Sequence, residues 1–110
     1  MIKNYKDKNP KISNTVFVAD SADIIGDVKI GDYSSVWFNA TLRGDQNKIK
    51  IGNKTSIQDN VVIHVDETNA VQIGDNVSVG HGAVLHEAGY VKCRRCCSCC
   101  RAVSRAKIHN

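Results

Sequence analysis

Residues 57–86 read IQDNVVIHVDETNAVQIGDNVSVGHGAVLH, and aliphatic residues recur in this stretch at nearly every sixth position. The recurring positions are Ile57, Ile63, Ile73, Val79 and Leu85. An amphipathic helix has a period of about 3.6 residues and a half-buried strand a period of about two, so neither explains a period of six. A fixed short repeat is typical of solenoids built from parallel β coils. The stretch therefore predicts a β-solenoid.

The same period extends over most of the chain, from Val18 to Val91. The positions upstream of Ile57 are Val18, Ile24, Ile30, Val36, Leu42 and Ile51. Two steps are longer than six, nine residues from Leu42 to Ile51 and ten from Ile63 to Ile73. Gly-Asp or Gly-Asn pairs punctuate the repeat at 26–27, 31–32, 52–53 and 74–75. We expect about four triangular coils, each of three hexads, stacked at the strand spacing of about 4.8 Å.

Stacking the hexads predicts one outward-facing column of functional side chains. If coils start at Val18, Val36, Ile57 and Val79, their second faces begin at Ile24, Leu42, Ile63 and Leu85. The residues that follow the last three of these are Arg43, His64 and His86. His64 and His86 are then one coil apart, which suits two ligands of one metal ion with Zn–N distances of about 2.0–2.1 Å.

His81 does not join this column. It is the third residue of the Val79 hexad, on the first face, where we expect it to lie above Asp59. One chain would struggle to bring His81 to the metal that His64 and His86 bind. A neighbouring chain in a threefold trimer could supply it, so the sequence suggests a metal ion shared across a subunit interface.

These motifs resemble those of the γ-class carbonic anhydrases and their bacterial relatives. The resemblance runs from about residue 10 to His86 and rests on several matching stretches: 16–19, 25–28, 36–40, 42–45, 57–60, 64–66, 80–82 and 85–86. The histidine spacing of 17 and then five residues is specific. The resemblance implies an all-β, left-handed parallel β-helix of the hexapeptide-repeat type, assembled as a homotrimer.

The resemblance also implies roles for five further residues. Arg43 resembles the arginine that lies near the metal, meets an acid of the adjacent subunit and holds bicarbonate; Asp45 and Asp59 are the candidates for that acid, and trimer assembly is the alternative role. Gln58 resembles the glutamine that positions metal-bound solvent. Glu67 matches the place of a proton-shuttling glutamate, although a solvated loop acid would look the same in the sequence. A second shuttle acid would fall at Gln46, which cannot take up a proton.

The chemistry implied is the reversible hydration of CO2 to bicarbonate. Three neutral imidazoles leave open positions on Zn2+, with Fe2+ or Co2+ as alternatives. Water bound there loses a proton near pH 7 and becomes the hydroxide that attacks CO2. Two other functions stay open. Hexapeptide-repeat folds also serve acyl-CoA transferases, and the chain could be a non-catalytic trimeric assembly or metal-binding protein.

Composition divides the chain in two. All eleven Asp and Glu residues lie before residue 89, whereas residues 89–110 hold six Lys or Arg and all five cysteines. The net charge of +4 thus comes from the tail, and we expect no nucleic-acid partner. We expect a β-helix domain over 1–91 and a Cys/Arg-rich tail over 92–110. No apolar run is long enough to span a membrane and the N-terminus lacks a signal-peptide core, which predicts a cytoplasmic location.

The tail has three interpretations. The spacing Cys93-x-x-Cys96 is zinc-like, but no second pair follows at the distance of a zinc ribbon. A disulfide framework conflicts with a reducing cytoplasm. We favour a disordered or out-of-frame segment, because codons for residues 93–101 can be chosen so that the next frame reads Val-Gly-Asp-Ala-Val-Val-Val-Val-Gly, a continuing hexad. The coding DNA tests this.

Overall fold

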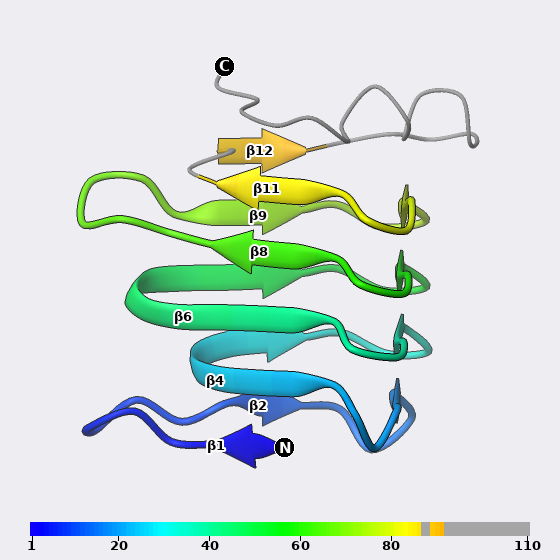
Figure 1. Cartoon of the computed structure of the whole chain (residues 1–110), viewed down its shortest axis with the longest axis horizontal. Coiled ribbons are helices and arrows are strands. Elements are labelled where there is room, and N and C mark those ends of the chain that lie inside the picture. The colour runs from blue at the N-terminus through cyan, green and yellow to red at the C-terminus, as the bar shows by residue number, and fades with distance from the viewer. Residues whose placement is uncertain (87–88, 92–110) are drawn as a thin grey trace.

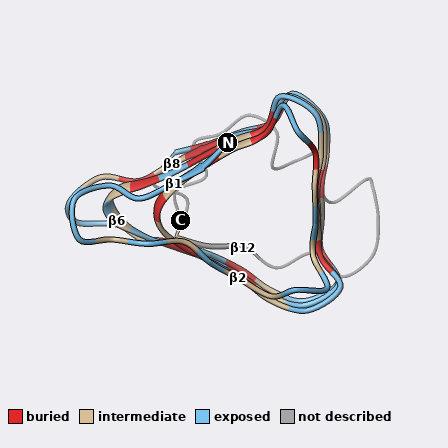
Figure 2. Cartoon of the chain, turned by 90° about the horizontal axis from the view of Figure 1, so that it is seen from below, coloured by how far each residue is buried: buried red, intermediate tan, exposed pale blue. Residues whose placement is uncertain are grey.

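The computed structural model describes residues 1–86 and 89–91, and this part of the chain is all-β. The predicted tail over 92–110 and its boundary lie outside the described residues. Every pair of strands is parallel, and the chain winds into stacked coils (Figure 1). Seen along the stack, the coils form a triangle (Figure 2). The β-helix predicted from the hexads is confirmed.

The twelve strands of the described residues fall on three faces. The first face contains β3 (Phe17–Val18), β5 (Ser35–Val36), β7 (Ser56–Ile57) and β10 (Ser78–Val79). The second contains β1 (Ile2–Lys3), the first halves of β4 (Asp23–Ile30) and β6 (Thr41–Ile51), then β8 (Val62–His64) and β11 (Val84–His86). The third contains β2 (Lys11–Ile12), the second halves of β4 and β6, then β9 (Val71–Ile73) and β12 (Gly89–Val91).

The register of the strands agrees with the predicted coils. Along the second face Ile24 pairs with Leu42, Leu42 with Ile63, and Ile63 with Leu85. These side chains point inward and are fully buried, and the hexad residues of the other faces complete a single aliphatic core. Burial of aliphatic side chains, worth roughly 1.5–3 kcal/mol each, therefore fixes which residue of each hexad faces the interior.

The coil at the N-terminus was missed in the sequence. Ile2 pairs with Ile24 and Ile12 with Ile30, so residues 1–12 add a partial coil below the first predicted one. The signal was present, because Ile12 lies six residues before Val18 and Ile2 lies ten before Ile12, the same steps as from Ile63 to Val79. Lys8 enters the site described below from this added coil.

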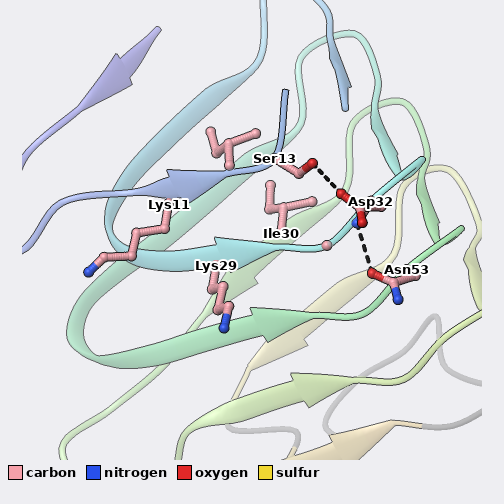
Figure 3. A pocket seen from close by; sticks show the side chains of 8 residues that line it. Lys11, Ser13, Lys29, Ile30, Asp32 and Asn53 are labelled. Carbon is pink, nitrogen blue, oxygen red and sulfur yellow. Dashed lines mark hydrogen bonds between the residues drawn. The ribbon is translucent and has the colours of Figure 1, made fainter. Parts of the chain in front are cut away.

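The Gly-Asp and Gly-Asn pairs form a ladder along one corner. Asn53 Oδ1 accepts a hydrogen bond from the backbone N–H of Asp32 at 2.8 Å, and Asp75 Oδ1 accepts one from that of Asn53 at 2.7 Å. Figure 3 shows the N-terminal end of this ladder, where the hydroxyl of Ser13 donates to Asp32. A Cβ on Gly52 would lie 2.8 Å from backbone atoms of Gly74, so the coils stack this closely only where glycine is present.

Candidate metal centre

His64 and His86 form the predicted column on the second face. Arg43 of β6 is in register with His64 of β8, and His64 is in register with His86 of β11. The two imidazole rings stack with centroids 5.1 Å apart and only 4° between their planes. Because parallel in-register strands present equivalent side chains in the same direction, the rings lie one above the other with their edges on the same side. Two imidazoles one coil apart would share a single metal ion with their rings turned toward it.

A carboxylate lies beside His64. Asp45 Oδ1 is 3.6 Å from His64 Nε2, and Asp45 Oδ2 accepts a hydrogen bond from Arg43 at 3.1 Å. Asp45 comes from the three-residue insertion in β6, since Gly26 pairs with Gly44 but Val28 pairs with Ile49. The nine-residue step from Leu42 to Ile51 thus places a carboxylate next to the histidine column.

The charges around His64 favour its neutral form. Burial lowers the pKa of the His64 imidazole, the nearby Arg43 guanidinium lowers it further, and the Asp45 charge only partly opposes them. Burial disfavours ionisation of Asp45, but the hydrogen bond from Arg43 and its positive charge outweigh that effect and lower the pKa of Asp45. A neutral imidazole is the form that binds a metal ion, because its ring nitrogen keeps a lone pair.

Two buried atoms at this point lack hydrogen-bond partners among the residues that the structure describes, namely His64 Nε2 and Asp45 Oδ1. A buried polar atom without a partner costs roughly 1–3 kcal/mol, so such atoms are rare unless something else satisfies them. The imidazole nitrogen can bind a divalent metal ion directly, and the carboxylate oxygen can bind the ion or accept a hydrogen bond from a group that does. The residues present therefore fit a metal ion.

The other predicted residues occupy a different part of the coil. Gln58 and Asp59 follow β7, and His81 follows β10 one coil higher, where the N–H of Gly82 donates to the carbonyl of Asp59 at 2.9 Å. Gln58 Nε2 donates to the Ser78 hydroxyl at 2.9 Å. Within residues 1–86 and 89–91 of one chain, no three His, Cys, Asp or Glu side chains come together as a metal-binding group. A third histidine ligand from the same chain is thus not brought to the column.

Glu67 lies in the second insertion, residues 65–70 between β8 and β9. Its side chain is exposed, and its backbone carbonyl accepts a hydrogen bond from Asn47 at 3.2 Å. The structure also adds Lys8, whose Nζ donates to the backbone carbonyl of Asp45 at 2.9 Å. Neither Lys8 nor Asn47 was singled out in the sequence. The only signal for Asn47 was its place in the nine-residue step.

Apolar side chains are exposed both near the histidine column and near the Gln58, Asp59 and His81 corner. Near the first face the rings of Phe17 and Trp37 pack at a tilt of 42° with centroids 4.8 Å apart, and Trp37 meets Phe38 edge-on at 6.0 Å. Phe17 and Phe38 remain about half exposed, at 47% and 49%. On the second face Val62 and Val84, each two residues before a column histidine, are also exposed. Apolar side chains in such positions are typical of surfaces that are covered in an assembly.

A hollow of about 500 Å3 lies elsewhere, on the third face (Figure 3). It is lined by Lys11, Ile12, Ser13, Lys29, Ile30, Gly31, Asp32 and Asn53. It contains none of the histidines, so the candidate chemistry lies with the column. None of the described residues forms a helix long and apolar enough to cross a membrane.

The coil geometry and the histidine column define a class, the left-handed hexapeptide-repeat β-helices. No protein-family model matches the sequence. Gamma carbonic anhydrase 2 of Arabidopsis thaliana mitochondria is 50% identical over 91 residues, which cover 77% of this chain and 33% of that protein. A carbonic anhydrase of Geobacillus kaustophilus is 47% identical over 88 residues, covering 80% of this chain and 48% of that protein.

A solved structure is similar to this chain in both fold and sequence. A hexapeptide transferase family protein from Anaplasma phagocytophilum superimposes with a TM-score of 0.75 at 41% identity, covering 79% of this chain and 51% of that one. In sequence and fold the chain is similar to γ-carbonic anhydrases and to other hexapeptide-repeat proteins. It spans about half the length, or less, of these relatives.

Proposed function

We propose that this chain contributes to the reversible hydration of CO2 to bicarbonate at a metal centre shared between the subunits of a homotrimer. One observation carries the proposal: two stacked, in-register imidazoles, with His64 Nε2 and Asp45 Oδ1 buried and without hydrogen-bond partners in the described residues. His64 and His86 would hold the metal ion from one chain. Zn2+ is the first choice, with Fe2+ and Co2+ as alternatives.

His81 of a neighbouring copy is the proposed third ligand. In support, His81 is exposed on its own chain and follows a different face from the column. A threefold assembly would bring the first face of one chain against the second face of the next. It would also cover the exposed apolar side chains of both faces, among them Phe17, Phe38, Val62 and Val84. The cytoplasmic location stays a prediction.

In the overall reaction, water adds to the carbon of CO2, and bicarbonate and one proton leave. A metal ion held by neutral imidazoles would supply Lewis-acid activation of that water near neutral pH. Arg43 presents a guanidinium about half exposed, which can hold two oxygens of a carboxylate-like product. Gln58 would position the reacting water. Glu67 has an exposed carboxylate, which can carry the proton to buffer.

Asp45 and Asp59 are the two carboxylates proposed to contact Arg43, one within the chain and one across the subunit interface. In a single chain Arg43 pairs with its own Asp45, which holds that carboxylate beside His64. Asp59 lies next to the His81 corner, and in the proposed trimer it is the acid that would approach Arg43 of the adjacent subunit. Such ion pairs set the relative orientation of subunits as well as the site.

Native mass spectrometry of the 110-residue chain, after exchange into Zn2+, tests the assembly and the metal together. We expect a trimer that carries about three metal ions, as sites shared by symmetry require. Stopped-flow CO2 hydration on the same sample tests the activity. His64→Ala should abolish both metal binding and hydration, whereas Lys54→Ala, an exposed change at another corner, should leave both intact. A metal-free monomer without hydration activity would refute the proposal.

A hexapeptide acyl-CoA transferase is the second candidate, because the similar Anaplasma protein is a member of the hexapeptide transferase family. The two functions differ in one assay. Turnover of acetyl-CoA by the His64→Ala variant as well as by the unsubstituted chain would favour the transferase. Metal binding without turnover of either CO2 or acetyl-CoA would favour a non-catalytic assembly or metal-binding protein.

A further inference from the structure

Asn47 joins the two insertions that interrupt the hexads. Its side-chain Nδ2 donates to the backbone carbonyls of Asp66 at 3.3 Å and Glu67 at 3.2 Å. Its Oδ1 accepts from the backbone N–H of Lys48 at 2.9 Å, which fixes the orientation of the amide. A single side chain of one coil thus holds the backbone of the next coil on either side of Glu67.

The loop that Asn47 holds needs such an anchor. Residues 65–70 lie between the end of β8 and the start of β9, where the parallel ladder is interrupted. The loop closes on itself through Asp66, whose Oδ1 accepts from the N–H groups of Thr68 at 3.0 Å and Asn69 at 2.8 Å. This internal turn shapes the loop, and Asn47 ties the Asp66 and Glu67 carbonyls to the coil below.

Asn47 also acts from the same side of β6 as Asp45. Side chains two residues apart on a strand project to the same side, and here Asp45 and Asn47 are half-buried while Gln46 and Lys48 between and beyond them are exposed. The Asp45 carboxylate lies beside the His64 imidazole, and the Asn47 amide donates to the Glu67 carbonyl. The inserted residues of β6 therefore contact both ends of the segment 64–67.

We propose that Asn47 is the positioning residue for Glu67: its amide anchors the 65–70 loop so that the Glu67 carboxylate keeps a fixed place in the loop that follows His64. The part that concerns proton transfer rests on the proposed function. Water addition and bicarbonate release come before the proton leaves, so kcat/KM reports the earlier steps and only kcat includes the transfer through Glu67.

Asn47→Asp tests the anchor with the smallest change in shape. The aspartate keeps an oxygen for the Lys48 N–H but replaces the donor by an acceptor that faces two carbonyls, which is repulsive. Hydrogen exchange followed by NMR should speed up about tenfold or more at the Thr68 and Asn69 amides, while the Ile63 amide in β8 stays unchanged. Asn14→Asp, the same charge change at an exposed turn, should have no effect at these amides.

In the CO2 hydration assay, Asn47→Asp should lower kcat about tenfold with kcat/KM within twofold, and imidazole buffer should restore kcat by taking the proton directly. Asn47→Ala, which removes the amide without adding charge, should behave alike. Unchanged exchange at Thr68 and Asn69 would overturn the anchor. A freed loop with unchanged kcat, or an equal fall in kcat and kcat/KM, would overturn the positioning role. If the unsubstituted chain does not hydrate CO2, the proposed function fails, and the exchange data alone decide the anchor.

Discussion

Replacing Gly52 by alanine should destabilise the β-helix strongly, because the Gly-Asp/Asn corner leaves no room for a Cβ. An alanine Cβ would lie 2.8 Å from both the carbonyl carbon and the oxygen of Gly74, and closer still to Asp75 Oδ1. Backbone atoms of the next coil cannot turn aside, so the two coils must separate. The same shift would break the hydrogen bond of 2.7 Å from the Asn53 N–H to Asp75.

The magnitude follows from these two effects. Forcing one extra carbon into a packed position costs about 1–3 kcal/mol, and losing a hydrogen bond costs about 0.5–1.5 kcal/mol. We therefore expect Gly52→Ala to lower the free energy of unfolding by roughly 2–4 kcal/mol, which is about 10–20 °C in Tm for a chain of this size. Circular dichroism during thermal and urea unfolding measures both quantities.

Gly80→Ala is the matched control. It lies on the first face, has no atom within 4 Å of an added Cβ, and does not require a positive φ. Alanine there should stabilise slightly, by about 0.4–1 kcal/mol, because it restricts the unfolded chain. The double variant Gly52→Ala/Asp75→Ala should recover only part of the loss, since the clash with the Gly74 backbone remains. Equal stability of Gly52→Ala and Gly80→Ala would refute the close-stacking argument.

Three further variants test the core and the site. Thr55→Val should cost about 1–3 kcal/mol in urea unfolding, because the buried Thr55 hydroxyl donates to Gly74 at 2.7 Å and accepts from the Val77 N–H at 3.2 Å, and both would lose their partner; a loss below about 0.5 kcal/mol would contradict this. His86→Ala should remove bound Zn2+ in metal analysis while leaving the Tm of the metal-free chain nearly unchanged, because the side chain is exposed; full metal content would argue against the column. Asp45→Asn should weaken Zn2+ binding about 10–100-fold in competition with a chelator, because it removes the charge beside His64; unchanged affinity would show that the carboxylate serves assembly alone.

Much of the fold followed from the sequence because one physical rule repeats along the chain. Each coil must bury one aliphatic side chain per face, so the period of six sets the register, and the observed pairing of Ile24, Leu42, Ile63 and Leu85 matches it. The coil that contains Ile2 and Ile12 was missed because these two residues are ten apart and so break the period of six. The step from Ile63 to Ile73 is also ten residues and shows that a coil can accommodate it.

The candidate site was predicted in part. The column of Arg43, His64 and His86 followed from register alone, since in-register parallel strands align equivalent positions. The contact of Asp45 with His64 and the anchoring of Glu67 by Asn47 did not follow, because both depend on the path of the inserted residues and on side-chain rotamers. The part played by His81 depends on a second copy of the chain, and it stays a prediction.

The departures from the period explain why the site lies where it does. The first face, which neither insertion enters, keeps an in-register ladder of Ser35, Ser56 and Ser78. A strict hexad gives the backbone no freedom to place a carboxylate beside a histidine of the next coil. The extra residues around Asp45 and around Glu67 provide that freedom on adjacent coils, and Asn47 then restores the rigidity that the interrupted ladder loses. The regular hexads therefore supply stability, and the two insertions supply the polar contacts of the site.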